Sequence, residues 1–302
     1  MALKDRIIHS PSGELLVNYY HEIEGKVLPK LLNDGYAVQK YCKKFFDKQV
    51  DLENPVLFYE KLNWYKLNGK IPLMEVCANK YTMRDYVREK GYGECLNDLL
   101  DVYSSVGDID IVSLPDRFVL KASHGTHMQI IVKDKSKIDW KHSKRLMRSW
   151  LRQDIYWRGR EWVYKEMPRH IIAEKYIEDE SGELRDYKIF CFNGAPRFIQ
   201  HDIGRFTKHI RNYYYTDWKM MDMTDYVGND PSLNIPAPKS LQKMLEIAKD
   251  LSQPFQFVRI DFYEVGGQPY VGEMTFFHEG GSINLIPEKW NRIVGDYWEL
   301  VE

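Results

Sequence analysis

The amino-acid sequence predicts an α+β fold, and three observations support that prediction. Strand-like runs in the second half of the chain follow one another through glycine turns, which is typical of antiparallel hairpins. An amphipathic helix is expected over residues 240–251, where apolar residues recur on one face. Residues 1–75 carry helical and irregular patterns, so the strands are expected in the rest of the chain.

The composition limits the class of protein. The chain has 302 residues, 44% hydrophobic and 14% aromatic, which predicts about two domains with a large core. Lysine and arginine (43) balance aspartate and glutamate (44), which gives no argument for a nucleic-acid or anionic-membrane partner. The four cysteines lie far apart and form no C-x-x-C pair. This spacing predicts reduced thiols, as in cytosolic proteins, and not a disulfide framework. Without a signal-peptide pattern or a long apolar run, we expect a cytoplasmic protein that does not insert into membranes.

Helices and a pair of strands are the first elements along the chain. Asn54 is expected to cap a helix that begins at Pro55. Asn79-Lys80 opens a second helix, which Gly91 ends. Two strands are then expected over residues 117–122 and 129–132.

The turn Ser123-His124-Gly125-Thr126 joins these two strands, and Lys121 lies at its mouth. Residues 140–150 predict a basic helix, whose charges more commonly form a solvated face than a ligand site. A strong apolar strand is expected over residues 171–177, and it contains Glu174 and Lys175.

Asn193-Gly194 is the best short-range hairpin signal, and it is expected to join strands over residues 186–192 and 196–201. Less regular segments surround this hairpin. We expect a turn over residues 179–183, a polar connection over 205–212, a strand or loop over 213–222 and a closing helix over 287–300.

The last hairpin allows two registers. Val258, Ile260 and Phe262 alternate with polar residues, and Gly266-Gly267 marks the turn. A two-residue loop pairs Val265 with Gln268 and sets Asp261 opposite Gly272. A three-residue loop pairs Val265 with Pro269, and we expect this second register. A slip of one residue would turn every side chain to the other face.

In the expected register Asp261 faces Glu273, and Arg259 faces Thr275. Like charges directly opposite each other are destabilising, so this pair requires a cation. Hard oxygen ligands on adjacent strands suit Mg²⁺ that carries phosphates. The alternative is that Arg259 neutralises both carboxylates and that nothing binds.

Several common site motifs are absent from the sequence. It has no G-x-x-x-x-G-K-[ST] loop, no G-x-G-x-x-G, no zinc-like spacing of His and Cys, and no nucleophile elbow. The remaining candidates for a functional site are lysines and carboxylates at or near strand ends: Lys121, Glu174-Lys175, Asp186 and Lys188. Charges within apolar strands need partners, so a network of structural salt bridges is one explanation, including a pair between Lys121 and Glu174. Phosphoryl chemistry, which needs cations and metal-binding carboxylates, is the other.

From about Asn54 to the C-terminus the chain resembles the ATP-grasp superfamily, and within it the TupA-like branch linked to teichuronopeptide and surface-polysaccharide synthesis. The segments that carry the resemblance are NPVLFYEKLNWYKL, NKYTMRDYV, LPDRFVLKASHG, IIVKDKSKIDW, REWVYKEMPRHIIAEKYIED, DYKIFCFNGAPRFIQ, FVRIDFY and GEMTF. The resemblance implies two α+β lobes that clamp ATP after a helical N-terminal segment. The expected boundaries are residues 1–75, 76–178 and 179–302.

The resemblance also implies roles for individual residues in nucleotide binding. Lys121 would contact the α-phosphate, with Lys80 as a helper, beside the loop Ser123-His124-Gly125. The segment Glu174-Lys175-Tyr176-Ile177 would hold adenine by its backbone, with Glu174 or Lys175 near the exocyclic amine. Asp186 or Glu178 would face the ribose.

The implied catalytic and metal-binding residues lie further along the chain. Lys188 and Arg211 would reach the γ-phosphate or the acyl group, and Arg259 would stabilise an oxyanion or phosphate. Mg²⁺ would be held by Asp261, Glu273 and Thr275.

Two departures from the family pattern stand out. The phosphate loop, Gly125-Thr126-His127-Met128, is poor in glycine, and Thr275 stands where many relatives have asparagine.

The function implied by the resemblance is ATP-dependent carboxylate–amine ligation through an acyl phosphate. The implied partners are ATP, Mg²⁺, an amino acid or other amine, and a uronic-acid or peptidyl carboxyl on a polysaccharide. Two alternatives stay open: a kinase that phosphorylates a sugar, and a nucleotide-binding assembly protein without turnover. The sequence does not indicate the acceptor, the amine or the oligomeric state.

Overall fold

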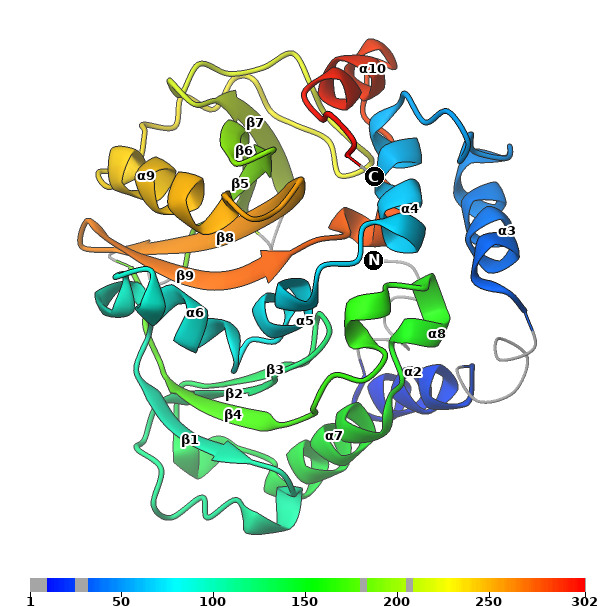
Figure 1. Ribbon diagram of the computed structural model, residues 1–302. Coiled ribbons are helices and arrows are strands. Elements are labelled where there is room, and N and C mark those ends of the chain that lie inside the picture. Colours follow the sequence, from blue (N-terminus) through cyan, green and yellow to red (C-terminus); the bar gives the residue numbers. More distant parts are fainter. Residues whose placement is uncertain (1–9, 25–31, 180–183, 205–208, 302) are drawn as a thin grey trace. The chain divides into compact units, whose positions relative to one another are not determined.

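The computed structural model describes residues 10–24, 32–179, 184–204 and 209–301 (Figure 1). The chain divides into two compact units. The first contains residues Met1–Ala37, Asn79–Tyr81 and Asp98–Tyr176, and the second contains Val38–Ala78, Thr82–Asn97 and Ile177–Glu302. The three-part division expected from the sequence stays a prediction.

The first unit is built on an antiparallel four-stranded sheet, ordered β1-β4-β2-β3. Its strands are β1 (Leu99–Tyr103), β2 (Phe118–Ala122), β3 (Gln129–Val132) and β4 (Ile171–Lys175). Its helices are α2 (Pro11–Glu24), α7 (Trp140–Arg152) and α8 (Tyr156–Gly159), with short 3-10 helices η3 (Val106–Asp108), η4 (Lys135–Lys137) and η5 (Trp162–Tyr164). Helix α7 buries Met147 and Trp150 against the sheet, and α2 lies beside it (Figure 1).

The second unit is built on an antiparallel five-stranded sheet, ordered β7-β6-β5-β8-β9. Its strands are β5 (Asp186–Phe192), β6 (Ala195–Ile203), β7 (Ile210–Tyr215), β8 (Phe257–Val265) and β9 (Gln268–Thr275). Its helices are α4 (Phe58–Asn68), α5 (Pro72–Ala78), α6 (Met83–Glu89), α9 (Leu241–Ser252) and α10 (Lys289–Asp296), with 3-10 helices η2 (Gly93–Cys95) and η6 (His278–Gly281). Helix α3 (Asp34–Phe46) packs Val38 and Cys42 against Tyr59.

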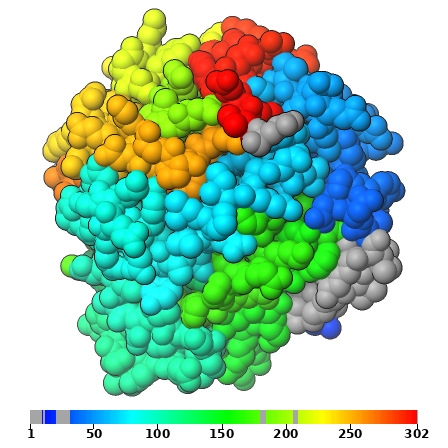
Figure 2. All heavy atoms as spheres, viewed as in Figure 1, coloured from blue at the N-terminus to red at the C-terminus, as the bar shows by residue number. Residues whose placement is uncertain are grey.

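The two faces of this second sheet are covered differently. Helix α9 packs on one face, where the Cys191 thiol lies 3.7 Å from the Ala248 carbonyl oxygen. The other face ends in an aromatic cluster in which Phe192 and Phe257 contact Phe58 of α4 and Trp298. Helix α5 packs beside β9, and their cyan and orange surfaces adjoin in Figure 2. The rest of the second face is polar.

Most expected elements are present, with shifted ends. The 129–132 and 186–192 strands are confirmed residue for residue, and Asn193 and Gly194 adopt the positive φ angles (46° and 76°) of the expected tight turn. The strand expected over 171–177 ends at Lys175. Strand β7 begins inside the expected polar connection (205–212) and covers only the first three residues of the region expected as a strand or loop (213–222). The expected closing helix is the shorter α10. Residues 180–183 of the predicted turn and 205–208 of the predicted connection lie outside the described residues.

The prediction that Asn54 caps the first well-marked helix is wrong. Helix α4 begins at Phe58, after the N-cap residue Leu57. The Glu60 carboxylate accepts hydrogen bonds from the backbone N–H groups of Leu57 (3.0 Å) and Val56 (3.1 Å). A carboxylate in the first turn satisfies donors that lack partners within the helix, so the start moves toward it.

The last hairpin combines features of both registers. Val265 pairs with Gln268 across the two-residue turn Gly266-Gly267, so the predicted three-residue loop is wrong. Both glycines have positive φ, 60° and 86°, as a two-residue type I′ turn requires. Asp261 nevertheless pairs with Glu273, and Arg259 with Thr275, as expected.

A β-bulge reconciles the turn with these pairings. Phe262 pairs with Val271 and the preceding residue, Asp261, pairs with Glu273, so Gly272 is the extra residue. A Cβ atom at position 272 would lie 2.6 Å from Cε2 of Tyr263, so only glycine fits without a shift of that ring. The bulge restores the alternation on which the expected carboxylate pair depends.

Candidate functional site

The polar face of the second sheet gathers charged side chains from all five strands. The residues on it are Asp186, Lys188, Asp202, Arg211, Arg259, Asp261, Glu273 and Thr275. The pairing register puts them there: Lys188 is opposite Asp261, and Asp202 is opposite Arg211. Directly paired residues share one face of a sheet, so the pattern of alternation brings the charges together.

Lys188 lies at the centre of this face and is buried. Its ammonium contacts three carboxylates: Asp186, Asp261 at 3.1 Å and Asp202 at 3.7 Å. Burial alone would lower the pKa of Lys188, but the negative charges of Asp186 and Asp261 outweigh it, so this pKa is raised. Lys188 therefore carries a fixed positive charge at neutral pH.

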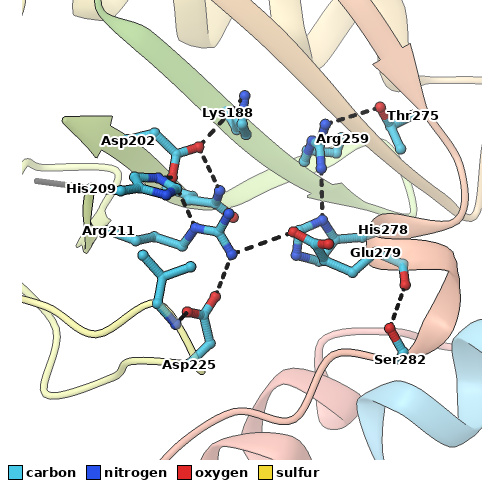
Figure 3. Close-up of polar contacts among 12 residues, drawn as sticks. Lys188, Asp202, His209, Arg211, Asp225, Arg259, Thr275, His278, Glu279 and Ser282 are labelled. Atoms are coloured by element: carbon cyan, nitrogen blue, oxygen red, sulfur yellow. Dashed lines mark hydrogen bonds and ion pairs between the residues drawn. The ribbon is translucent and has the colours of Figure 1, made fainter. Parts of the chain in front are cut away.

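Arg211 forms the second cationic centre (Figure 3). Its guanidinium contacts Asp202 at 2.8 Å, Asp225 at 2.6 Å and Glu279 at 3.4 Å. Burial by itself raises the pKa of Asp202, but Arg211 and then Lys188 outweigh it and hold this pKa well below its usual range. His209 also contacts Asp202, at 2.9 Å.

Arg259 and Asp261 form a two-pronged ion pair on β8. Nε and Nη2 of Arg259 each donate to one oxygen of Asp261 at 2.7 Å, and Nη2 also donates to the Thr275 hydroxyl at 3.1 Å. The Thr275 hydroxyl donates in turn to Glu273 at 3.1 Å. One part of the alternative stated from the sequence, the pairing of Arg259 with the Asp261 carboxylate, is thus present.

His278 holds the remaining guanidinium nitrogen of Arg259, Nη1 (Figure 3). Nη1 of Arg259 lies 2.7 Å from Nδ1 of His278. Because arginine can only donate, Nδ1 accepts and the proton of the neutral imidazole is on Nε2. Burial, and then the charge of Arg259, lowers the pKa of His278 well below its usual value. The imidazole is therefore a permanent acceptor for Arg259 near neutral pH.

The turn that carries His278 and Glu279 is held by helix α4. Glu279, Gly280 and Gly281 all have positive φ angles. The Asn63 side chain donates to the Gly281 carbonyl at 2.8 Å, and the Lys66 ammonium donates to the Gly280 carbonyl. A Cβ atom at position 281 would meet Asn63 Oδ1 at 2.8 Å. Buried polar side chains of α4 thus fix the turn that faces Arg259 and Arg211.

In the first unit, Lys121 and Glu174 form an ion pair at 2.6 Å, with 16% and 9% of the side chains exposed. The pair forms because β2 and β4 are neighbours, with Val119 opposite Glu174 and Lys121 opposite Ile172. The alternative pairing considered from the sequence is therefore present. The role of Lys121 as a phosphate contact stays a prediction.

The loop between β2 and β3 is tied down by its neighbours. The Lys80 ammonium donates to the Gly125 carbonyl at 2.7 Å, and the Lys80 N–H donates to the Ser123 carbonyl at 2.8 Å. His124 is buried against the Trp150 carbonyl, and burial lowers its pKa to about 4. Gly125 has φ 73°, and a Cβ there would lie 2.3 Å from Ile155. Lys80, Ser123, His124 and Gly125 thus form one rigid loop.

The expected adenine segment contains the point in the chain at which the first unit ends and the second begins. Glu174 and Lys175 end strand β4, Tyr176 is the last residue of the first unit, and Ile177 and Glu178 begin the second. Lys175 is exposed and contacts Asp98 at 3.1 Å. The Arg117 guanidinium stacks over the Tyr176 ring at 4.2 Å.

The predicted site residues fall into two groups, one in each unit. Lys80, Ser123, His124, Gly125, Lys121, Glu174, Lys175 and Tyr176 belong to the first, and Ile177, Glu178, Asp186, Lys188, Arg211, Arg259, Asp261, Glu273 and Thr275 to the second. The sequence reasoning missed Asp202, Asp225, His278 and Glu279. Asp202 lies one position past the end of the strand expected at 196–201, and the run His278-Glu279-Gly280-Gly281 was a polar signal that could have been used.

The donor set of this face fits Mg²⁺ in its chemistry. Asp261 and Glu273 are opposed carboxylates, and the Thr275 hydroxyl contacts Glu273. Within the part of the chain that the structure describes, no group of three or more His, Cys, Asp or Glu side chains is arranged so that it could hold a metal ion by itself. Mg²⁺ commonly takes only one or two carboxylates and completes its shell with water and phosphate oxygens, so the chemistry of these donors fits it, and their assignment as metal ligands stays a prediction.

Comparison with known proteins identifies the family. A family model described as TupA-like ATPgrasp matches residues 60–299. No curated protein matches the chain. No helix among the described residues is both long and apolar enough to cross a bilayer.

The solved structures that resemble the chain are distant. An L-amino acid ligase from Bacillus licheniformis has 14% identity and a TM-score of 0.45, over 83% of this chain and 57% of that one. An N5-carboxyaminoimidazole ribonucleotide synthetase with ADP has 13% identity and a TM-score of 0.44, over 72% and 50%. A D-alanine–D-alanine ligase from Bacillus anthracis with ATP has 15% identity and a TM-score of 0.39, over 67% and 55%. The chain thus spans between half and two thirds of these proteins.

The family match covers most of the chain, and it includes both antiparallel sheets and the charged face of the second. It confirms the α+β ATP-grasp fold expected from the sequence. The chain belongs to the TupA-like ATPgrasp family.

Proposed function

We propose that the protein is an ATP- and Mg²⁺-dependent carboxylate–amine ligase of the cytoplasm. It would join an amino acid or other amine to a uronic-acid or peptidyl carboxyl during bacterial surface polysaccharide biosynthesis. Family membership supports ATP use and ligation. The observation that carries the proposal is the buried group Lys188, Arg211 and Arg259 beside the opposed carboxylates Asp261 and Glu273.

The three cations are held in place before any substrate arrives. Lys188 and Arg259 share Asp261, and Arg211 is fixed by Asp202 and Asp225. Cations fixed in advance at a water-poor site stabilise developing negative charge without reorganisation. Lys188 and Arg211 would bind the transferred phosphoryl group or the acyl group, and Arg259, oriented by His278, would stabilise the oxyanion.

In the proposed reaction a carboxylate oxygen attacks the γ-phosphorus of ATP and ADP departs. An amine nitrogen then attacks the acyl carbon, inorganic phosphate departs with the C–O bond electrons, and the nitrogen loses one proton to that phosphate or to water. Asp261, Glu273 and Thr275 would hold Mg²⁺, which neutralises phosphate charge when bound. Because Asp261 also accepts from Arg259 and Lys188, the same carboxylate sets the positions of the metal and of both cations.

We assign the nucleotide contacts to residues of the first unit and to Ile177, Glu178 and Asp186, which belong to the second. Lys121 would contact the phosphates, and the loop Ser123-His124-Gly125 would approach them with Lys80 bracing the Gly125 carbonyl. Glu174 to Ile177 would hold adenine, and Asp186 or Glu178 the ribose. The rigidity of the loop offsets its small number of glycines, since its backbone does not need to be ordered on binding.

Replacement of Asp261 by asparagine tests the metal assignment. Asp261→Asn should abolish ATP consumption in Mg²⁺ and leave the circular dichroism spectrum unchanged, since the residue keeps its shape and loses one charge. Asp222→Asn, a change at an exposed ion pair with Lys289, is the matched control and should keep full turnover. A well-folded Asp261→Asn protein with wild-type turnover would show that the hairpin is only structural.

The reaction type is tested separately from nucleotide binding. With γ-labelled ATP, an amine and an acidic acceptor, a ligase releases ADP and phosphate in proportion to amide. Hydroxylamine should trap the activated carboxyl as a hydroxamate. Label retained on the acceptor would instead identify a kinase, and ATP binding without any turnover would identify a non-catalytic nucleotide-binding protein.

A further inference from the structure

A groove in the first unit is lined by none of the predicted site residues. It has a volume of about 570 Å³ and lies between helices α2 and α7. One wall is apolar, from Leu15, Leu16 and Tyr19, and the other is cationic, from Arg145, Arg148 and Arg152. The function proposed above uses none of these residues.

Helix α7 presents its positive charge as a stripe. Its 13 residues include no aspartate or glutamate. Lys141, Arg145, Arg148 and Arg152 are all exposed and follow at intervals of four, three and four, which places them along one face. Among the described residues, neither Arg145 nor Arg148 has a carboxylate within ion-pair distance. The stripe is therefore a local cationic surface in a chain whose net charge is only −1.

The apolar wall is exposed to an unusual degree. Leu16 is 65% exposed and Tyr19 60%, and Tyr20 beside them is 61% exposed. Leu15 alone packs toward the core, and the contact of Gln153 with Asn18 at 2.7 Å fixes α2 on α7. A cluster of exposed leucine and tyrosine beside a cationic stripe is a mark of an interaction surface.

We infer that this groove binds the anionic surface of a phospholipid bilayer. Guanidinium groups bind phosphate with two hydrogen bonds, and tyrosine prefers the boundary between water and the acyl region. Here α7 supplies the cationic wall and α2 the exposed apolar wall, and the two together offer the combination of charge and apolar surface that binds at a membrane interface. The protein would adsorb to the membrane through α2 and α7 and would not span it.

An acidic polysaccharide fits the groove less well. Such a polymer presents many hydroxyl groups, which need amide and carboxylate partners as well as cations. Among the described residues that line the groove, none is Asp, Glu, Asn or Gln, and only Ser12 and Ser149 supplement the arginines and Tyr19 as polar partners. Leucine walls gain more from acyl chains and glycerol than from sugar rings.

The inference predicts binding of the purified full chain to vesicles of phosphatidylcholine that contain about 30% phosphatidylglycerol, and weak binding to phosphatidylcholine alone. Arg145→Gln and Arg148→Gln should each lower the vesicle affinity about fivefold, and together about 25-fold. Sedimentation with vesicles at low ionic strength measures this. At about 1 M salt, where the Debye length is near 3 Å, the arginine effect should vanish.

Matched variants separate the groove from a general charge effect. Lys40→Gln with Lys43→Gln removes two exposed charges from α3 and should leave vesicle binding unchanged. Leu16→Ser with Tyr19→Ser should weaken binding at low and at high salt. All these positions are exposed, so thermal melts should not change, and ATP consumption should persist in every variant.

Three results would overturn the inference. The first is wild-type protein that does not bind the anionic vesicles, and the second is binding that survives the double arginine change. The third is arginine-dependent binding to soluble polygalacturonate, or concentration-dependent dimerisation through these residues, without vesicle binding.

Discussion

Lys121 and Glu174 show why a residue's neighbours must be known before its role is assigned. The ammonium that the sequence suggests for phosphate binding already has a partner at 2.6 Å. A phosphate would have to share Lys121 with Glu174 or displace it. The pair therefore sets both the stability of the first sheet and the cost of binding nucleotide.

Substitution of either partner separates these two effects. Lys121→Met leaves Glu174 without this cation, so the free energy of unfolding should fall by about 2–4 kcal/mol. Glu174→Gln should cost less, because the glutamine can still accept a hydrogen bond from Lys121. The double variant should lose less than the sum of the single changes, as chemical denaturation can measure.

Affinity for a non-hydrolysable ATP analogue should respond differently. Lys121→Met should weaken binding about 10- to 150-fold, the value of one hydrogen bond to a charged group. Glu174→Gln keeps the ammonium and should bind the phosphates at least as tightly as the native protein. Equal affinities for Lys121→Met and the native chain, in folded protein by calorimetry, would remove Lys121 from the nucleotide site.

At the scale of elements, the β8–β9 hairpin depends on one glycine. Gly272 lets the strand carry a bulge, and the bulge brings Asp261 opposite Glu273 despite the two-residue turn. Without the bulge, Asp261 would face position 272 and Glu273 would turn to the other face. The candidate metal site thus depends on a position that contributes no side chain.

Gly272→Ala should destabilise the hairpin and the site together. The new Cβ would lie 2.6 Å from the Tyr263 ring, which predicts a loss of about 1–3 kcal/mol in the free energy of unfolding. ATP consumption should fall with it, because the two carboxylates lose their register. Gly107→Ala, where the nearest atom is 3.4 Å away, should change neither quantity. A stable, active Gly272→Ala protein would show that the bulge is dispensable.

For the whole molecule, buried histidines predict the response of stability to acid. Burial lowers the pKa of His124 and of His201 to about 4. The unfolded chain binds protons at these side chains below about pH 6.5, and the folded protein does so only near pH 4. Stability is therefore complete above pH 6.5 and falls as the pH drops from 6.5 to 4, by about 2 kcal/mol per histidine at pH 5.

His201 allows a clean test, because it lies among Tyr187, Tyr214 and Trp218 and belongs to no predicted site. His201→Phe keeps an aromatic ring of similar size and removes the titrating group. Denaturant melts should show a loss between pH 7 and pH 5 that is about 2 kcal/mol smaller than in the native protein. Asp202, whose pKa is lowered, contributes to stability until the pH falls below the ordinary aspartate pKa near 3.8. Its titration therefore does not affect the change in stability between pH 7 and pH 5. An unchanged pH dependence would mean that His201 does not titrate in this range.

Local patterns in the sequence determined most of the elements of this protein. The alternation of β8, the Asn193-Gly194 turn and the amphipathic face of α9 each depend on residues close in the chain, so they could be predicted. The opposition of Asp261 and Glu273 was also predicted, although through the wrong loop. The family was also predicted from the sequence, because the motifs that identify it are short continuous segments of the chain.

Only the tertiary structure decided which charges meet. Lys188 is surrounded by Asp186, Asp202 and Asp261, from three strands, and Asn63 of α4 holds the turn at Gly281 across 218 positions of the chain. A buried charge is stable only beside its partners, and those partners are chosen by strand order and register. Periodicity shows that a side chain lies on a face of the sheet, but the pairing of distant strands determines what shares that face.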